Sequence, residues 1–225
     1  MNERELTDAV AKLYRVFARY PLRDDVSYCD HCIAPEDVAA LHAVPLHEAP
    51  VRMLGRLLIN HSTWGDREYH LHFLPRLLEL VATGAMNASS YSVWLPAFLI
   101  PCRDGPADEH RALDDFFSAW WRHTLTTWPA PCEPQEVLVL LKASGQPVAP
   151  YLAAWGSYGG TAAIRHLEAL ITDLTTGSSV EYGIREELDA WICGPIPDAV
   201  LAATDADDVL EEVRSFREWY CPPPS

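Results

Sequence analysis

The chain has 225 residues, of which 49% are hydrophobic and 22% are charged, values typical of a soluble globular protein with a packed core. Its 32 Asp and Glu residues against 17 Lys and Arg residues give a formal net charge of −15, and it contains no basic run. This balance argues against nucleic acid and against an anionic membrane surface as partners, because both require clustered Lys or Arg. An acidic surface favours a protein partner with a basic surface.

The N-terminus and the cysteines predict a cytoplasmic protein. The opening MNERELTDAV has acids where a signal peptide needs a basic and then an apolar run. The longest apolar window, over 91–101, is too short and too interrupted by proline to span a bilayer. Six cysteines without the spacing of a disulfide framework are expected to be reduced thiols in that compartment.

Helical periodicity is present from the start of the chain. A stripe of apolar residues predicts an amphipathic helix over 3–20, which a proline ends. The segment 21–34 is a loop by composition. Pro35, followed by two acids, predicts the first turn of a short helix that reaches about residue 43. After a connector bracketed by prolines, a third helix is expected over 51–63.

The stretch TWGDREYHLHFLPRLLEL, residues 63–80, is predicted to join two helices. Gly65 favours the left-handed conformation that ends one helix, and Asp66 is expected to cap the next. That next helix carries leucines on its buried face. Pro75 removes a backbone donor and clashes with the preceding turn, which predicts a kink or a break. Gly84 is expected to end the helix.

The remainder of the chain is also helical by pattern. A further apolar helix is expected from Ser89 through Phe98, and the clearest helix of the chain covers 106–126. Shorter helices are expected over 136–143, 149–155, 161–174, 187–191 and 205–219. Because no alternation typical of strands occurs, the predicted class is all-α, an irregular multi-helix bundle or a short solenoid-like array of about eleven or twelve helices. We expect a single domain over 1–225 with a soft subdivision at the prolines of 129–134.

A resemblance to a known family rests on several stretches between Cys29 and Leu174. They are CDHCIAPED, LHAVPL, TWGDREYHLHFLPRLLEL, HRALDDFFSAWW, VAPYLAAW and AAIRHLEAL. In these stretches the chain resembles a family of uncharacterised, all-helical bacterial cytoplasmic proteins, and TWGD with FLPRLLEL is the most specific part. The resemblance implies an all-helical cytoplasmic protein with a CxxC loop near its N-terminus, and it implies no particular activity.

Cys29 and Cys32 are the one cysteine pair with a spacing typical of metal ligands. Structural zinc takes four tetrahedral ligands, and two thiols two residues apart can hold one ion from a single turn. No second C-x-x-C follows, so histidines would have to complete the site. The candidates are His42, His47, His61, His70 and His72.

The predicted zinc quartet is Cys29, Cys32, His42 and His72. His70 and His72 point about 200° apart on a helix, so they cannot both face one ion. The alternative is a pair of reduced structural cysteines with scattered surface histidines. A redox-active C-x-x-C is disfavoured because no βαβ pattern surrounds it.

Two acid–histidine pairs stand four residues apart on one predicted helix, Asp66 with His70 and Glu68 with His72. Such a pair can orient a histidine for metal binding or base catalysis. A solvated pair on a helix surface explains the same spacing and is the interpretation we prefer. The segment WGSYGG, residues 155–160, lacks G-x-S-x-G and a preceding strand, so it is interpreted as a break between helices.

The sequence therefore predicts a non-enzymatic cytoplasmic binding or interaction module, with a structural zinc site as a second feature. HExxH, a P-loop and GxGxxG are all absent. One alternative is an acidic immunity-type or inhibitor protein that neutralises a basic toxin. The other is a metal-dependent enzyme that uses Asp66, His70 or His72.

The acidic residues are concentrated late in the chain. The segment 181–218 contains eleven acids and three arginines. Adjacent carboxylates on a helix diverge by about 100°, which does not suit a shared catalytic proton. The pairs Asp207–Asp208 and Glu211–Glu212 are therefore expected to form a solvated face, and this face is the candidate docking surface for a basic protein.

Overall fold

The computed structural model describes residues 2–87, 93–158, 160–176, 184–194 and 207–221, and in these ranges it contains eleven α-helices and no strand. The all-α prediction is confirmed. The helices are α1 Asn2–Phe17, α2 Pro35–His42, α3 Val51–Ile59, α4 Arg67–Ala82, α6 Pro96–Leu99, α7 Ala107–Thr126, α8 Pro134–Ala143, α9 Ala149–Trp155, α10 Thr161–Thr176, α11 Arg185–Ile192 and α13 Asp207–Tyr220. Two 3₁₀ helices, η1 Leu46–Glu48 and η2 Ile100–Asp104, complete the set.

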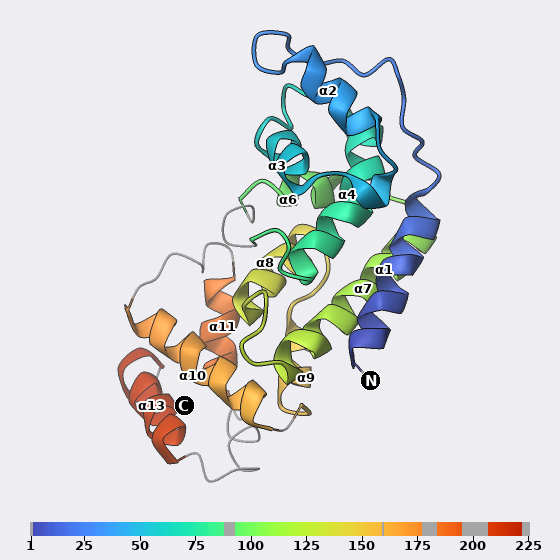
Figure 1. Cartoon of the computed structure of the whole chain (residues 1–225). Helices are drawn as coiled ribbons and strands as arrows, with labels where there is room; N and C mark the ends of the chain where they lie inside the picture. Colours follow the sequence, from blue (N-terminus) through green and yellow to red (C-terminus); the bar gives the residue numbers. More distant parts are fainter. Residues whose placement is uncertain (1, 88–92, 159, 177–183, 195–206, 222–225) are drawn as a thin grey trace.

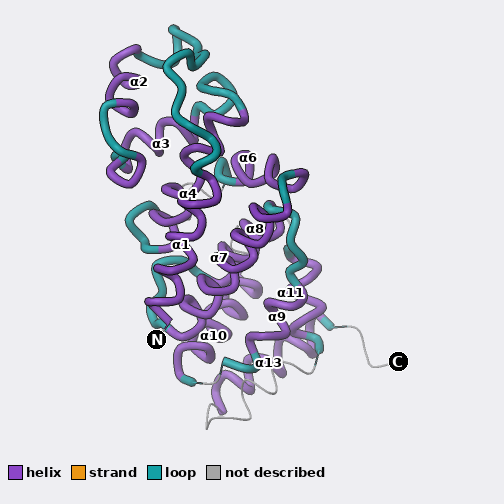
Figure 2. Tube along the Cα trace, turned by 90° about the vertical axis from the view of Figure 1, so that its right-hand side faces the viewer, coloured by secondary structure: helices purple, strands orange, loops and turns teal. Residues whose placement is uncertain are grey.

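The helices form an elongated array (Figure 1). α2 and α3 lie at one end, α1, α4 and α7 occupy the middle, and α10, α11 and α13 lie at the other end. Figure 2 shows that the long loop segments gather at the end that holds α2. No helix among the described residues is long and apolar enough to cross a membrane.

α7 is the helix around which the middle of the molecule packs. It lies along α1 and also contacts α8, α9 and α10. Its predicted apolar stripe is confirmed, since Leu113, Phe116, Phe117, Trp120, Trp121 and Leu125 are all buried. Each such side chain contributes about 1.5–3 kcal/mol through burial. A single cluster of buried apolar residues extends from Leu6 to Phe216, so the helices before and after 129–134 share one core.

The junction before α4 forms only in part as its residues predict, because α3 ends at Ile59, with Asn60 as its C-cap, and not at Gly65. Gly65 has a φ of 82°, the left-handed region that favours glycine. The Asp66 carboxylate accepts a hydrogen bond from the backbone N–H of Tyr69 at 3.0 Å and so caps α4. Trp64, between the two helices, is fully buried. The junction is thus a packed joint between the two helices.

A kink or a break is expected at Pro75, and the break does not occur: α4 continues through this residue. Proline deprives the Leu71 carbonyl of its helical donor and costs about 3 kcal/mol inside a helix. Here the neighbouring turns bury Leu74, Leu77 and Leu78 completely, and this packing outweighs the local cost. Residues 89–92 of the helix expected from Ser89 through Phe98 lie outside the described residues, 93–95 form a turn, and α6 begins at Pro96.

Candidate functional site

The loop that carries Cys29 and Cys32 connects α1 to α2 and is tied to the junction before α4. The Cys29 N–H donates to the Thr63 carbonyl at 2.9 Å, and an isolated antiparallel bridge pairs Tyr28 with Trp64. The N–H groups of Cys32 and Ile33 both donate to the Cys29 carbonyl, which closes a tight turn.

The two cysteines of this turn are free thiols that solvent can reach. Cys29 is half-buried and Cys32 is exposed. Hydrogen bonds from the backbone at His31 and Cys32 lower the pKa of the Cys29 thiol, whereas the hydrogen bond with Cys29 raises the pKa of the Cys32 thiol. The turn therefore presents two interacting sulfur atoms, an arrangement that can chelate a thiophilic ion.

The two predicted histidine ligands contact other groups. The Nε2 atom of His42 lies 2.9 Å from the Tyr69 hydroxyl, and Nδ1 of His72 donates to the Tyr20 carbonyl at 2.8 Å. Burial lowers the pKa of both rings. Across the described residues, no three His, Cys, Asp or Glu side chains lie close enough to hold one metal ion. The structure does not assemble the quartet, and zinc binding stays a prediction.

In the two acid–histidine pairs at the start of α4, the acid and the histidine also contact different groups. Both Asp66 and Glu68 form ion pairs with Arg23. His70 is buried against Phe98, with ring centroids 4.5 Å apart, and its Nε2 donates to the Trp64 carbonyl at 2.7 Å. These residues hold the junction together, and the structure supplies no geometry for a shared catalytic centre among them.

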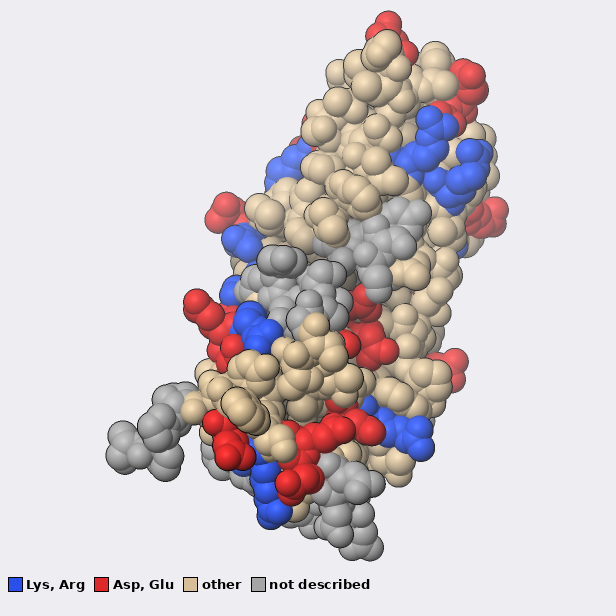
Figure 3. Space-filling view, turned by 90° about the vertical axis from the view of Figure 1, so that its left-hand side faces the viewer, with Lys and Arg blue, Asp and Glu red and all other residues tan. Residues whose placement is uncertain are grey.

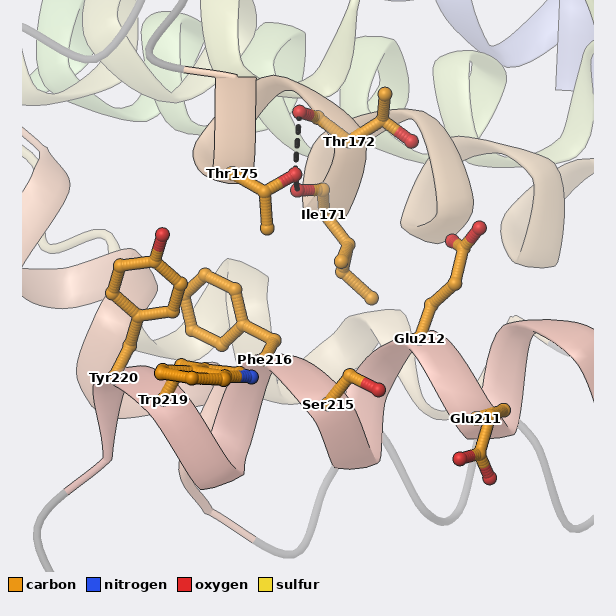
Figure 4. A pocket seen from close by; sticks show the side chains of 9 residues that line it. All are labelled: Ile171, Thr172, Thr175, Glu211, Glu212, Ser215, Phe216, Trp219 and Tyr220. Atoms are coloured by element: carbon orange, nitrogen blue, oxygen red, sulfur yellow. Dashed lines mark hydrogen bonds between the residues drawn. The ribbon is translucent and has the colours of Figure 1, made fainter.

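A groove lies at the opposite end of the molecule, between α10 and α13. Its volume is about 690 Å³ (Figure 4). The lining residues are Ile171, Thr172 and Thr175 of α10 and Glu211, Glu212, Ser215, Phe216, Trp219 and Tyr220 of α13. Figure 4 shows the three aromatic side chains gathered at the C-terminal end of α13, with Glu212 further along the helix. We call this surface the α10–α13 groove.

The aromatic end of the groove contains large exposed rings. α13 packs on α10 through buried Val209, Val213 and Phe216, as its apolar stripe predicts. Trp219 lies off this stripe and is 81% exposed, and Tyr220 is 52% exposed. The Phe216 and Tyr220 rings stack with centroids 4.8 Å apart. Exposed tryptophan and tyrosine beside a hollow are typical of interaction sites.

The other end of the groove is acidic. Glu212 points toward α10, whereas Glu211 points away from it (Figure 4). The Oε2 atom of Glu211 lies 3.8 Å from Nη1 of Arg214, and both side chains are largely exposed. This ion pair therefore contributes little to stability. Acidic side chains form the larger share of the charged surface at the lower end of the molecule in Figure 3. The side chains of Asp207 and Asp208 lie outside the described part of the structure.

The C-terminal end of α13 is attached to α11. A disulfide joins Cys193, at the end of α11, to Cys221, directly after α13. Arg217 donates from Nε to the Ile192 carbonyl at 2.7 Å and from a terminal nitrogen to the Gly194 carbonyl. The expectation that all six cysteines are reduced is wrong for this pair. The 28-residue separation gives no signal, because the fold alone brings the two helix ends together.

Among the groove residues, sequence reasoning identified Glu211 and Glu212 but missed Trp219 and Tyr220. The available signal was Trp219 itself, a large aromatic on the polar side of an amphipathic helix. Comparisons of the chain with protein-family models, with curated proteins and with solved structures find no match in any of the three.

Proposed function

We propose that this protein is a non-enzymatic cytoplasmic interaction module that binds a basic segment of a protein partner, rather than nucleic acid, in the α10–α13 groove. The observation that carries the proposal is the exposure of Trp219 in a groove that also contains Glu211 and Glu212. An indole 81% exposed leaves a large apolar area in water that a partner can cover.

Charge supports the choice of partner. The net charge of −15 and the acidic surface around α13 attract a basic protein and raise its rate of association. A dissociation rate slow enough for a specific complex then depends on local contacts. Trp and Tyr supply such contacts in many interfaces, because they bury a large area with few rotatable bonds.

The combination of rings and carboxylates in the groove suits arginine. One guanidinium group of the partner can stack on the face of Trp219, while another basic side chain of the same segment pairs with Glu212 further along α13. Stacking of this kind contributes about 0.5–2 kcal/mol. A volume of about 690 Å³ accommodates a few side chains, so the partner would present a short segment there. Arginine flanked by an apolar residue is the predicted signature.

A labelled synthetic peptide of arginine and leucine tests the proposal by fluorescence anisotropy. Trp219→Ala should weaken binding by at least about tenfold, as expected for a central aromatic contact. Glu212→Gln should weaken it less, and Trp219→Phe should restore part of the affinity. The matched control is Glu36→Gln, which neutralises an exposed acid on α2 at the far end. Equal affinity of all these variants would contradict the proposal.

An inhibitor of a basic toxin is the special case in which the partner is an enzyme whose activity the complex blocks. The same groove and the same variants apply. If the groove serves this purpose, Trp219→Ala should reduce inhibition of the toxin in proportion to the loss of binding. A metal-dependent enzyme is not proposed, because Asp66, His70 and His72 each contact a different group of the fold.

Zinc binding by Cys29 and Cys32 is a separate proposal, supported by the interacting free thiols of their turn. His42 and His72 are the predicted remaining ligands, and both would have to exchange their present contacts. Elemental analysis of protein purified without added metal should give about one zinc per chain, since four such ligands make one closed site. A stoichiometry near zero would exclude the site.

A further inference from the structure

We propose that the Cys193–Cys221 disulfide is a redox latch that controls the α10–α13 groove. The oxidised form holds the last turn of α13 in place and keeps the groove formed. The reduced form releases this turn and weakens partner binding. This inference rests on the function proposed above and assigns a means of regulating the same site.

The disulfide lies directly beside the binding surface. Cys221 follows Tyr220 directly, and both Trp219 and Tyr220 line the groove. A change in the position of Cys221 therefore shifts the two exposed rings before it affects any other part of α13. The opposite anchor, Cys193, follows α11, in which Leu188, Trp191 and Ile192 are buried. α11 is thus the fixed side of the latch.

Within the described residues, the last turn of α13 has fewer buried side chains than the turns before it. Val213 and Phe216 are buried and fasten the preceding turns in either redox state. Beyond Phe216, the side chains of Glu218, Trp219 and Tyr220 are exposed. Hydrogen bonds from Arg217 to the end of α11 and the stacking of the Tyr220 ring on Phe216 restrain this turn. Reduction should therefore loosen one turn without unfolding the helix.

The two cysteines of the bond are not enclosed in the core. Cys193 and Cys221 are both only partly buried. By contrast, Cys102 and Cys132 are buried, and desolvation raises the pKa of the Cys102 thiol to about 12, which makes it a poor nucleophile at neutral pH. Cys29 and Cys32 are accessible but lie at the far end of the molecule.

The reaction is ordinary thiol–disulfide exchange. A thiolate of a dithiol reductant attacks one sulfur of the bond, and the second thiolate of the reductant then resolves the mixed disulfide. Cys193 and Cys221 leave as two thiols, and the reductant becomes a disulfide. A low-molecular-weight disulfide reverses the reaction and is itself reduced to two thiols. In a reducing compartment, oxidation would therefore switch binding on.

Hydrogen exchange with dithiothreitol as the reductant tests the latch. A Cys29→Ser, Cys32→Ser background removes the other accessible thiols. Reduction should accelerate amide exchange over 217–221 by about tenfold or more and change it little over 209–214. It should also weaken binding of the arginine–leucine peptide. A variant with Cys193→Ser and Cys221→Ser should have the amide exchange and the peptide affinity of the reduced protein. Dithiothreitol should change neither.

Each possible result of these experiments either supports or contradicts the redox latch. Thiol alkylation that finds Cys193 and Cys221 free in the oxidised protein overturns the latch, and so does exchange over 217–221 that is unaffected by reduction. Faster exchange with equal peptide affinity in both forms shows that the bond does not control the groove. If the peptide binds neither form, the proposed function fails, while the exchange data still report whether the bond restrains the helix end.

Discussion

The two ends of the molecule differ in what their chemically versatile side chains contact. At the end that holds the junction before α4, Asp66 caps a helix, and His70 and His72 donate to backbone carbonyls. At the end that holds the α10–α13 groove, Trp219 and Tyr220 face solvent. Residue type and spacing show what a side chain can do. Burial and internal contacts decide whether that side chain is already bound within the protein or is available to a partner.

The histidines illustrate this lesson. Five of them place a ring nitrogen 2.7–3.0 Å from a backbone carbonyl oxygen, namely His61, His70, His72, His110 and His166. A carbonyl only accepts, so that ring nitrogen carries the proton in each case. Three of the five, His61, His70 and His72, are candidate metal ligands in the sequence, and each already contacts a backbone carbonyl in the fold.

The largest predicted effect contrasts two tryptophans. Trp64 is fully buried at the junction, so Trp64→Ala should lower the free energy of unfolding by about 3–5 kcal/mol. Trp219 is 81% exposed, so Trp219→Ala should change it by less than about 0.5 kcal/mol while weakening peptide binding. Urea unfolding followed by circular dichroism measures both. A large loss of stability in Trp219→Ala would show that this ring belongs to the core.

Much of the fold could be predicted from local signals. Pro35 and Asp66 mark helix starts through backbone chemistry that depends on few neighbours, and both function as expected. Gly65 has the expected left-handed conformation, but α3 ends earlier, at Ile59. The helix over 149–155 has the predicted bounds. Pro75 does not break α4, because the packing of a buried helix outweighs a local cost.

The candidate site could be predicted only in part. Glu211 and Glu212 stand out by charge, but the groove itself arises where α13 packs on α10, more than thirty residues earlier in the chain. The Cys193–Cys221 bond has the same origin. Contacts between such distant segments leave no periodic pattern in a single sequence. Trp219 and Tyr220 are therefore recognised as groove residues only in the three-dimensional structure.

A second prediction concerns pH and the histidines of the junction. Burial lowers the pKa of His70 and of His72 in the folded protein. The unfolded chain therefore binds protons first as the pH falls below about 6.5, the ordinary pKa of histidine. The stability that the two neutral rings contribute should be fully present above that pH. It should be lost as the pH falls through their lowered pKa values in the folded protein.

The measurement is urea unfolding at several pH values between 8 and 5, a range above the ordinary titration of carboxylates. His70→Gln keeps an N–H donor for the Trp64 carbonyl but cannot gain a proton, so its stability should depend less on pH. His47→Gln is the control, because His47 is exposed on η1. An identical pH dependence in wild type and His70→Gln would contradict the assignment of His70 as a buried neutral donor.

The smallest predicted effect distinguishes a structural from a catalytic Asp66. Its carboxylate caps α4 through the Tyr69 N–H, so Asp66→Ala should cost about 1 kcal/mol of stability. Asp66→Ser retains a capping oxygen and should recover most of this loss. Glu68→Ala removes a different carboxylate beside Arg23 without touching the cap, and it should change stability by less than about 0.5 kcal/mol. If Asp66→Ala left stability unchanged, the carboxylate would not be committed to the helix end, and the contrast between the two ends of the molecule would no longer hold for this residue.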